Sequence, residues 1–168
     1  MATTVITVED SVKLALNDLP TGLGNAGAFL SDQLLRGFIF DRVITSGTFV
    51  LTRYGAGPIF SADYSPSHAL YFDNASTPFA AESTETYDIF ARGLKVYLKS
   101  GSRTAGTISI LGTLVDFDRI MADVYFYLAN YRAQEVSSAI GGASLTPDAA
   151  YRALLDQHQY WKGVITSA

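Results

Sequence analysis

The C-terminal third of the chain, residues 115–165, most constrains the fold, because it predicts two helices joined by a Gly-Gly turn. Asp116 fits the N-cap of the first helix, where its carboxylate can accept hydrogen bonds from the first turn. Asp118 fits that turn, since the helix dipole favours negative charge there. Gly141 and Gly142 are expected to end the helix. Apolar residues recur between these limits at helical spacing, and they are Ile120, Met121, Val124, Leu128 and Tyr131.

The second helix has a clear start signal in Thr146, Pro147 and Asp148, which fit the N-cap, the first helical position and the first turn. Its apolar stripe follows at helical spacing and consists of Tyr151, Leu154, Leu155, His158, Trp161 and Ile165. Two helices with a short connection are expected to pack antiparallel.

Aromatic side chains spread beyond these stripes. The chain has 10 Tyr, 10 Phe and 1 Trp but is only 17% charged, and tyrosine is enriched at protein–protein interfaces because its ring is apolar while its hydroxyl can stay paired. A first helix that is apolar on more than one face is expected to meet the rest of the chain or another subunit. The candidate interface residues are Tyr125, Phe126, Tyr127, Tyr131 and Tyr160.

The chain between residues 37 and 115 changes to β-type patterning. Segments 38–44 and 48–54 predict a hairpin around Ser46 and Gly47. Segments 94–99 and 107–115 predict a second hairpin around a polar loop at 100–106. Shorter strands are expected at 59–60, 69–72 and 86–90.

The N-terminal segment predicts an extended stretch followed by short helices. β-branched residues favour a strand over residues 1–6. Thr7 and Asp10 resemble a capping box for the next helix, with Asp in place of Glu or Gln. Ser31 is expected to cap one or two further helical turns over residues 31–36.

These patterns predict an α+β fold with a short N-terminal helix, a mostly antiparallel β-sheet body and a C-terminal antiparallel helical hairpin. A length of 168 residues at 48% hydrophobic content fits one domain with a real core. Residues 1–36 would form its N-terminal helical segment, 37–115 its β-rich body and 116–165 its helical hairpin.

Several chemistries find no support in the sequence. The chain has no cysteine, which excludes disulfides, thiol nucleophiles and thiolate metal sites. Residues 22–27 read G-x-G-x-x-G, but they follow a predicted helix and Pro20 rather than a strand, so we expect a loop and not a nucleotide site. His68 is expected in an exposed turn, where a Ser–His–Asp site stays open. His158 is expected to be a satisfied core or interface histidine. We expect no enzyme activity, cofactor or metal site.

Localisation signals are also absent from the sequence. No apolar run approaches the ~20 residues that span a bilayer, and residues 1–10 lack the pattern of a secretory signal. We therefore expect folding in a cytoplasm and no membrane partner.

The charge pattern is weakly acidic. The formal net charge is −4, which argues against a phosphate-neutralising surface. Residues 54–91 contain no Lys or Arg, and their carboxylates are Asp63, Asp73, Glu82, Glu85 and Asp88.

Four stretches are similar to structural proteins of tailed bacteriophages: TVEDSVKLAL at 7–16, VDFD at 115–118, ADVYFYLA at 122–129 and LTPD at 145–148. Together they resemble head-to-tail connector proteins of the phage neck, of the adaptor or completion type. The β-rich segment 37–115 departs from the mostly helical adaptors, which leaves tail-terminator or capsid-decoration roles open.

The resemblance implies a non-enzymatic virion subunit, assembled in the host cytoplasm, that forms a homo-oligomeric ring between portal and tail or other neck proteins. DNA would pass through the ring, and the acidic segment would line the lumen so that like charge keeps the duplex from adhering. The alternative from another class is a monomeric ligand-binding module, for example glycan-binding, with its site near Tyr64, Tyr71 and Tyr87.

Overall fold

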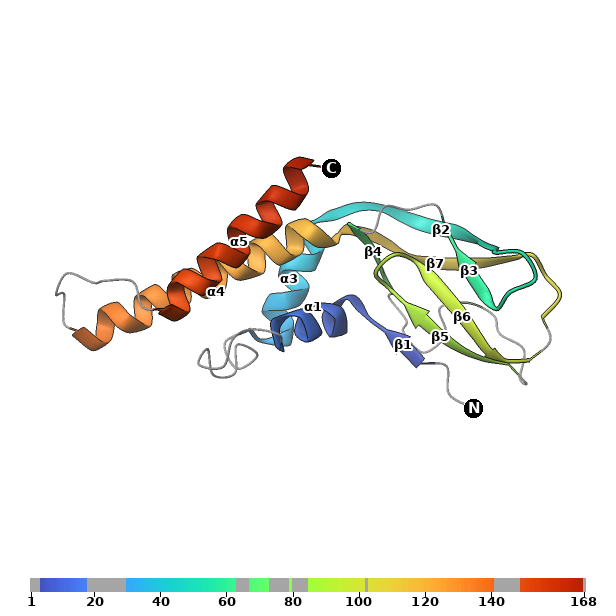
Figure 1. Ribbon diagram of the computed structural model, residues 1–168, viewed down its shortest axis with the longest axis horizontal. Coiled ribbons are helices and arrows are strands. Elements are labelled where there is room, and N and C mark those ends of the chain that lie inside the picture. The colour runs from blue at the N-terminus through green and yellow to red at the C-terminus, as the bar shows by residue number, and fades with distance from the viewer. Residues whose placement is uncertain are drawn as a thin grey trace. The chain divides into compact units, whose positions relative to one another are not determined.

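The computed structural model describes residues 4–17, 30–62, 67–72, 79, 85–101, 103–140 and 149–167. The chain divides into two compact units (Figure 1). One consists of Met1–Ser11 and Arg42–Phe117, and the other of Val12–Asp41 and Asp118–Ala168. The first holds the sheet and the second most of the helices, which confirms the α+β class. A single domain over residues 1–168 stays a prediction.

Within the described residues of the first unit, seven strands form one sheet in the order β1-β5-β6-β3-β2-β7-β4. Only β1 and β5 are parallel, and the other neighbours are antiparallel, so the mostly antiparallel body is confirmed. The strands are β1 (Thr4–Ile6), β2 (Val43–Arg53), β3 (Ile59–Ser61), β4 (His68–Tyr71), β5 (Thr86–Phe90), β6 (Lys95–Ser100) and β7 (Thr107–Asp116).

The sheet curls until its β4 edge meets the turn between β5 and β6. The Leu70 amide donates to the Ala91 carbonyl over 3.0 Å, and the Gly93 amide donates to the His68 carbonyl over 3.2 Å. Ala69 and Arg92 form an antiparallel bridge between these bonds. The curl gives the sheet an enclosed inner face and an outer face.

Alternate residues of the strands fill the inner face. These buried side chains include Phe49, Leu51, Phe60, Tyr87, Ile89, Val96, Leu98, Ile108 and Ile110. Register places them in layers, with Leu51 opposite Ile108 and Phe49 opposite Ile110. The core of this unit is therefore enclosed by the curled sheet.

The predicted capping box begins α1 (Val8–Asn17). The Asp10 amide donates to Thr7 Oγ1, and the Thr7 amide donates to Asp10 Oδ2, each over 3.1 Å. These reciprocal bonds satisfy two N–H groups at the helix start. Aspartate therefore serves here in the position that Glu or Gln usually takes.

In the second unit Ser31 caps α3 (Asp32–Phe40), since its hydroxyl accepts from the Leu34 amide over 3.2 Å. The C-terminal helices are α4 (Phe117–Ile140) and α5 (Ala149–Ser167). Figure 1 shows α5 running back along α4, in agreement with the predicted antiparallel pair. The predicted cap and turn residues Gly141, Gly142, Thr146, Pro147 and Asp148 lie outside the described residues, as does the glycine loop at 22–27.

The predicted hairpin over 38–54 is wrong. Residues up to Phe40 continue α3, and β2 runs unbroken from Val43 to Arg53. Ser46 and Gly47 lie inside this strand because β7 supplies the hydrogen-bonding partner along its length. A hydrogen bond of 2.8 Å joins the hydroxyls of Ser46 and Thr113. A local turn signal is therefore overridden by the long-range ladder.

The predicted pairing of 94–99 with 107–115 is also wrong, although both segments are strands. β6 pairs with β5 and β3, whereas β7 pairs with β2 and β4. The tight connection in this region is the β5–β6 turn, where Gly93 and Leu94 both have positive φ. Such a turn favours a close antiparallel pair.

Candidate functional site

The five candidate interface aromatics differ in exposure. Tyr125 is buried and belongs to the core of its unit. Tyr127 and Tyr131 are half-buried, with Tyr127 packed between the rings of Phe38 at 5.7 Å and Tyr131 at 6.3 Å. Phe126 is 49% exposed and Tyr160 is 60% exposed. Only these last two offer large areas to a partner.

His158 lies half-buried between α5 and α4. Its Nδ1 is 2.9 Å from the Ala122 carbonyl oxygen, and its ring centroid is 5.1 Å from that of Phe126. This geometry confirms the prediction of a satisfied histidine in a packed position. Phe126 thus contacts α5 through His158 while much of its side chain stays exposed.

The acidic candidates are less available than the sequence indicates. Asp63, Asp73 and Glu82 lie outside the described residues. Asp88 Oδ1 is 3.5 Å from Lys99 Nζ. Glu85 is buried and paired with Arg103. Glu85 therefore does not offer a free surface charge, because burial and the guanidinium offset it.

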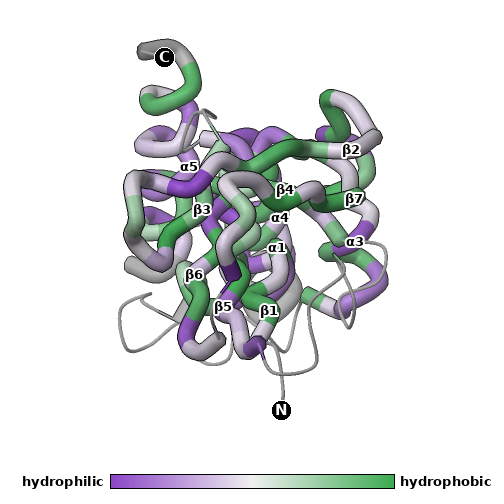
Figure 2. Tube along the Cα trace, turned by 90° about the vertical axis from the view of Figure 1, so that its right-hand side faces the viewer, coloured by the Kyte–Doolittle hydropathy of each residue, from purple (hydrophilic) through white to green (hydrophobic). Residues whose placement is uncertain are grey.

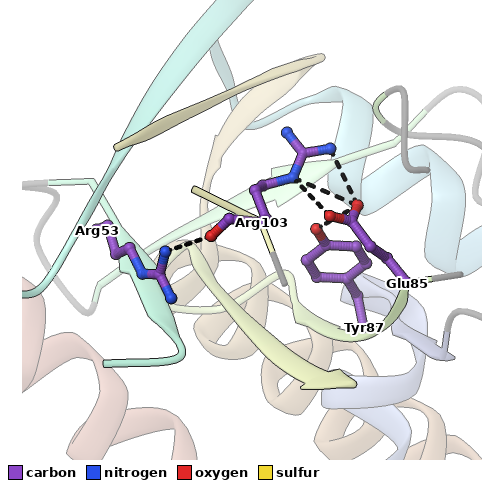
Figure 3. A network of polar contacts seen from close by, with 4 residues as sticks. All are labelled: Arg53, Glu85, Tyr87 and Arg103. Atoms are coloured by element: carbon purple, nitrogen blue, oxygen red, sulfur yellow. Dashed lines mark hydrogen bonds and ion pairs between the residues drawn. The ribbon is translucent and has the colours of Figure 1, made fainter. Parts of the chain in front are cut away.

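A polar network surrounds Glu85 (Figure 3). The Tyr87 hydroxyl donates to Glu85 Oε2 over 2.7 Å, and Arg103 Nη2 donates to the same oxygen over 3.1 Å. Arg103 Nε reaches Oε1 at 3.2 Å. Arg53 donates to the Arg103 carbonyl and, through Nε, to the Gly57 carbonyl over 2.7 Å. The network joins the inner face of the sheet to the loop that precedes β7.

Burial raises the pKa of Tyr87 to about 12, and its hydrogen bond to Glu85 adds to the shift. The hydrogen bonds from Arg103 to Glu85 raise the pKa of the guanidinium, so the arginine stays charged. Tyr87 is fully buried and its ring packs edge-on against Phe79 at 4.9 Å. A phenol held neutral and out of reach of solvent fits a structural role.

The described residues that were proposed for other chemistry, His68, Tyr71 and Tyr87, lie on strands of the sheet. His68 begins β4 instead of lying in an exposed turn, because this segment pairs with β7 and places His68 opposite Asp116. Among the described residues no group of three or more His, Asp or Glu side chains could hold a metal ion. Tyr64 lies outside these residues, Tyr71 is half-buried, and fully buried Tyr87 lines no open groove.

The outer face of the curled sheet is a candidate interaction surface that none of the sequence motifs indicated. Its large exposed side chains are Val50, Tyr54, Ile59, Phe90, Tyr97 and Leu111. They come from five segments that the sheet topology brings together. The available signal was the absence of charge along residues 43–52 and 107–115, which is unusual for strands with a solvated face.

Comparisons of the chain with protein-family models, curated proteins and solved structures found no match. In the part of the chain that the structure describes, no helix combines the length and the apolar character needed to cross a membrane.

Proposed function

We propose that this protein is a non-enzymatic structural subunit of a phage virion, a head-to-tail connector that forms a homo-oligomeric ring in the neck. The resemblance of the four stretches at 7–16, 115–118, 122–129 and 145–148 supplies the class. The observation that carries a subunit role is the apolar outer face of the sheet.

This face favours association because it leaves large apolar side chains in water. Leu111 is 66% exposed and Val50 is 56% exposed. Fully burying one such side chain is worth about 1.5–3 kcal/mol, and contiguous apolar surface on a soluble protein commonly marks an interaction site. Phe126 and Tyr160 offer further aromatic area on the second unit. An assembly would remove these surfaces from water.

We propose that only some of the five acidic residues in segment 54–91 face the DNA in the lumen of the ring. Glu85 is neutralised by Arg103, and Asp88 lies beside Lys99. The proposed DNA-facing carboxylates are therefore Asp63, Asp73 and Glu82. Charge reversal of these three residues should hinder DNA passage, whereas normal packaging and ejection would count against the lumen role.

The first test is the absolute mass of the purified protein by light scattering, with negative-stain images of the same fraction. A closed ring, alone or after mixing with portal protein, supports the connector. A strict monomer that joins no neck component contradicts it. A stacked ring on isolated tail tubes, or a subunit bound over capsid faces, would instead point to a tail terminator or a decoration protein.

A further inference from the structure

The longest strand pair in the sheet carries no charge along its ladder. β2 and β7 pair from Val43 opposite Val115 to Thr52 opposite Thr107, and none of these paired residues is ionisable. Figure 2 shows both strands in white and green along most of this length. Charged residues appear only at the strand ends, as Arg53 and Asp116.

Six outward residues of these strands form what we call the uncharged face: Thr48, Val50, Thr52, Thr107, Ser109 and Leu111. Residues between them point inward and are buried, including Phe49, Leu51 and Ile110. Thr48 lies opposite Leu111 and Val50 opposite Ser109. Val50 and Leu111 are thus diagonal neighbours, which in an antiparallel pair lie about 7–8 Å apart. Each of them faces a hydroxyl-bearing residue across the ladder, and the pair of Thr52 and Thr107 follows at one end.

The face continues onto β3 and β6 through aromatic side chains. Ile59 lies opposite Tyr97 in the sheet, and the Tyr54 amide donates to the Ile59 carbonyl over 2.9 Å. Lys95 and Lys99 lie on the same side of β6 as Tyr97 and bring the first positive charges. Asp88 lies opposite Tyr97, and its Oδ1 is 3.5 Å from Lys99 Nζ. The surface therefore has an uncharged centre and a margin that carries charges of both signs.

We propose that the uncharged face is the surface on which a second copy of this chain docks. The inference rests on the proposed ring-forming function and names its contact surface. Each copy carries a formal net charge of −4, so two copies repel each other wherever charged surfaces approach. Electrostatic repulsion between two copies is weakest where a charge-free face makes the contact. Such a face also has no charged groups with which to bind nucleic acid or a charged protein partner.

The size of the face limits the geometry of the contact. The six residues span five positions of each strand, roughly 16 Å, and two strands cover a width of about 10 Å, which gives a projected area on the order of 160 Å². A standard interface takes about 800 Å² from each partner. The contact must therefore extend over β3 and β6 and include Ile59 and Tyr97.

The test compares two leucines with equal exposure. Leu111 on the uncharged face and Leu14 on α1 are both 66% exposed, so Leu111→Lys and Leu14→Lys make the same change in the same solvent environment. We expect Leu111→Lys to weaken self-association by roughly tenfold or more, measured as the concentration dependence of mass by light scattering. Leu14→Lys should leave it unchanged.

A second measurement keeps the inference testable if Leu111→Lys misfolds. The chain contains no cysteine, so Leu111→Cys and Leu14→Cys each accept one spin label. The label at position 111 should lose mobility when the protein assembles, and the label at position 14 should not.

If the wild type assembles and the substitutions at positions 111 and 14 weaken association equally, the proposed docking surface is wrong. The proposal of a ring-forming subunit would not be affected by that result. A wild type that stays monomeric at every concentration, both alone and mixed with portal protein, would overturn both proposals.

Discussion

Tyr87 shows how a single residue joins the sheet to a loop in the first unit. Its ring fills the inner face, and its hydroxyl donates to a carboxylate that Arg103 also holds. Breaking a buried pair by removing one partner is costly, because the remaining charge stays out of water. The sequence shows Glu85 only as one carboxylate of the acidic segment 54–91, and the fold shows that its partner lies 18 residues further along the chain.

The raised pKa of Tyr87 predicts a loss of stability in alkali. The folded state keeps the phenolic proton up to about pH 12, whereas the unfolded chain releases it near 10.0. This stabilisation is fully present below pH 10 and decreases as pH rises through that window, by about 2–3 kcal/mol in total. The free energy of unfolding, measured with denaturant at several pH values between 10 and 12, should fall more steeply with pH for wild type than for Tyr87→Phe. Parallel stability curves would show that Tyr87 does not titrate in the folded protein as described.

The second prediction at the residue scale concerns Gly112, where any side chain would clash with its neighbours. A Cβ there would lie 2.8 Å from the Tyr71 carbonyl oxygen and 2.9 Å from Leu70 Cγ. Gly112→Ala should therefore destabilise the protein by about 1–3 kcal/mol, since overpacking forces neighbouring atoms to move. Gly106→Ala is the matched control, because a Cβ at Gly106 meets nothing within 4 Å. Similar melting temperatures for the two variants would contradict the close approach.

At the scale of elements, local patterns located most strands and helices but not their partners. The capping box at Thr7, the cap at Ser31 and the strand at 86–90 depend on neighbours in sequence, and the structure confirms them. The two predicted hairpins, around Ser46 and Gly47 and around 100–106, are wrong because the strands there pair with segments far away in the sequence. Local turn residues do not encode such long-range partners. The uncharged face likewise arises only when β2 and β7 lie side by side.

The stripe on α5 predicts which of its leucines supports the helical pair. Leu154 is buried, whereas the adjacent Leu155 is half-buried. Leu154→Ala should cost about 2–5 kcal/mol through lost burial and the cavity left behind, and Leu155→Ala should cost clearly less. Thermal unfolding followed by circular dichroism measures both variants. A Leu154→Ala protein that melts like wild type would mean that α5 does not pack through this residue.

At the scale of the whole molecule, the charge distribution and the apolar surface lead to the same expectation. Carboxylates exceed basic side chains by four, yet the strands with the most exposed aliphatic surface carry no charge along their ladder. Length, composition and charge lead to the proposal of an interacting subunit, whereas the proposed surface can be derived only from the sheet topology.

Association through the uncharged face predicts a particular dependence on salt. Like-charged copies repel over the Debye length, which shortens from about 30 Å at 0.01 M to about 10 Å at 0.1 M ionic strength. Added sodium chloride screens this repulsion and does not weaken apolar contacts, so self-association should strengthen across that range. Sedimentation velocity at fixed protein concentration measures the change. Weaker association with added salt would indicate an interface held by ion pairs and would exclude the uncharged face as its centre.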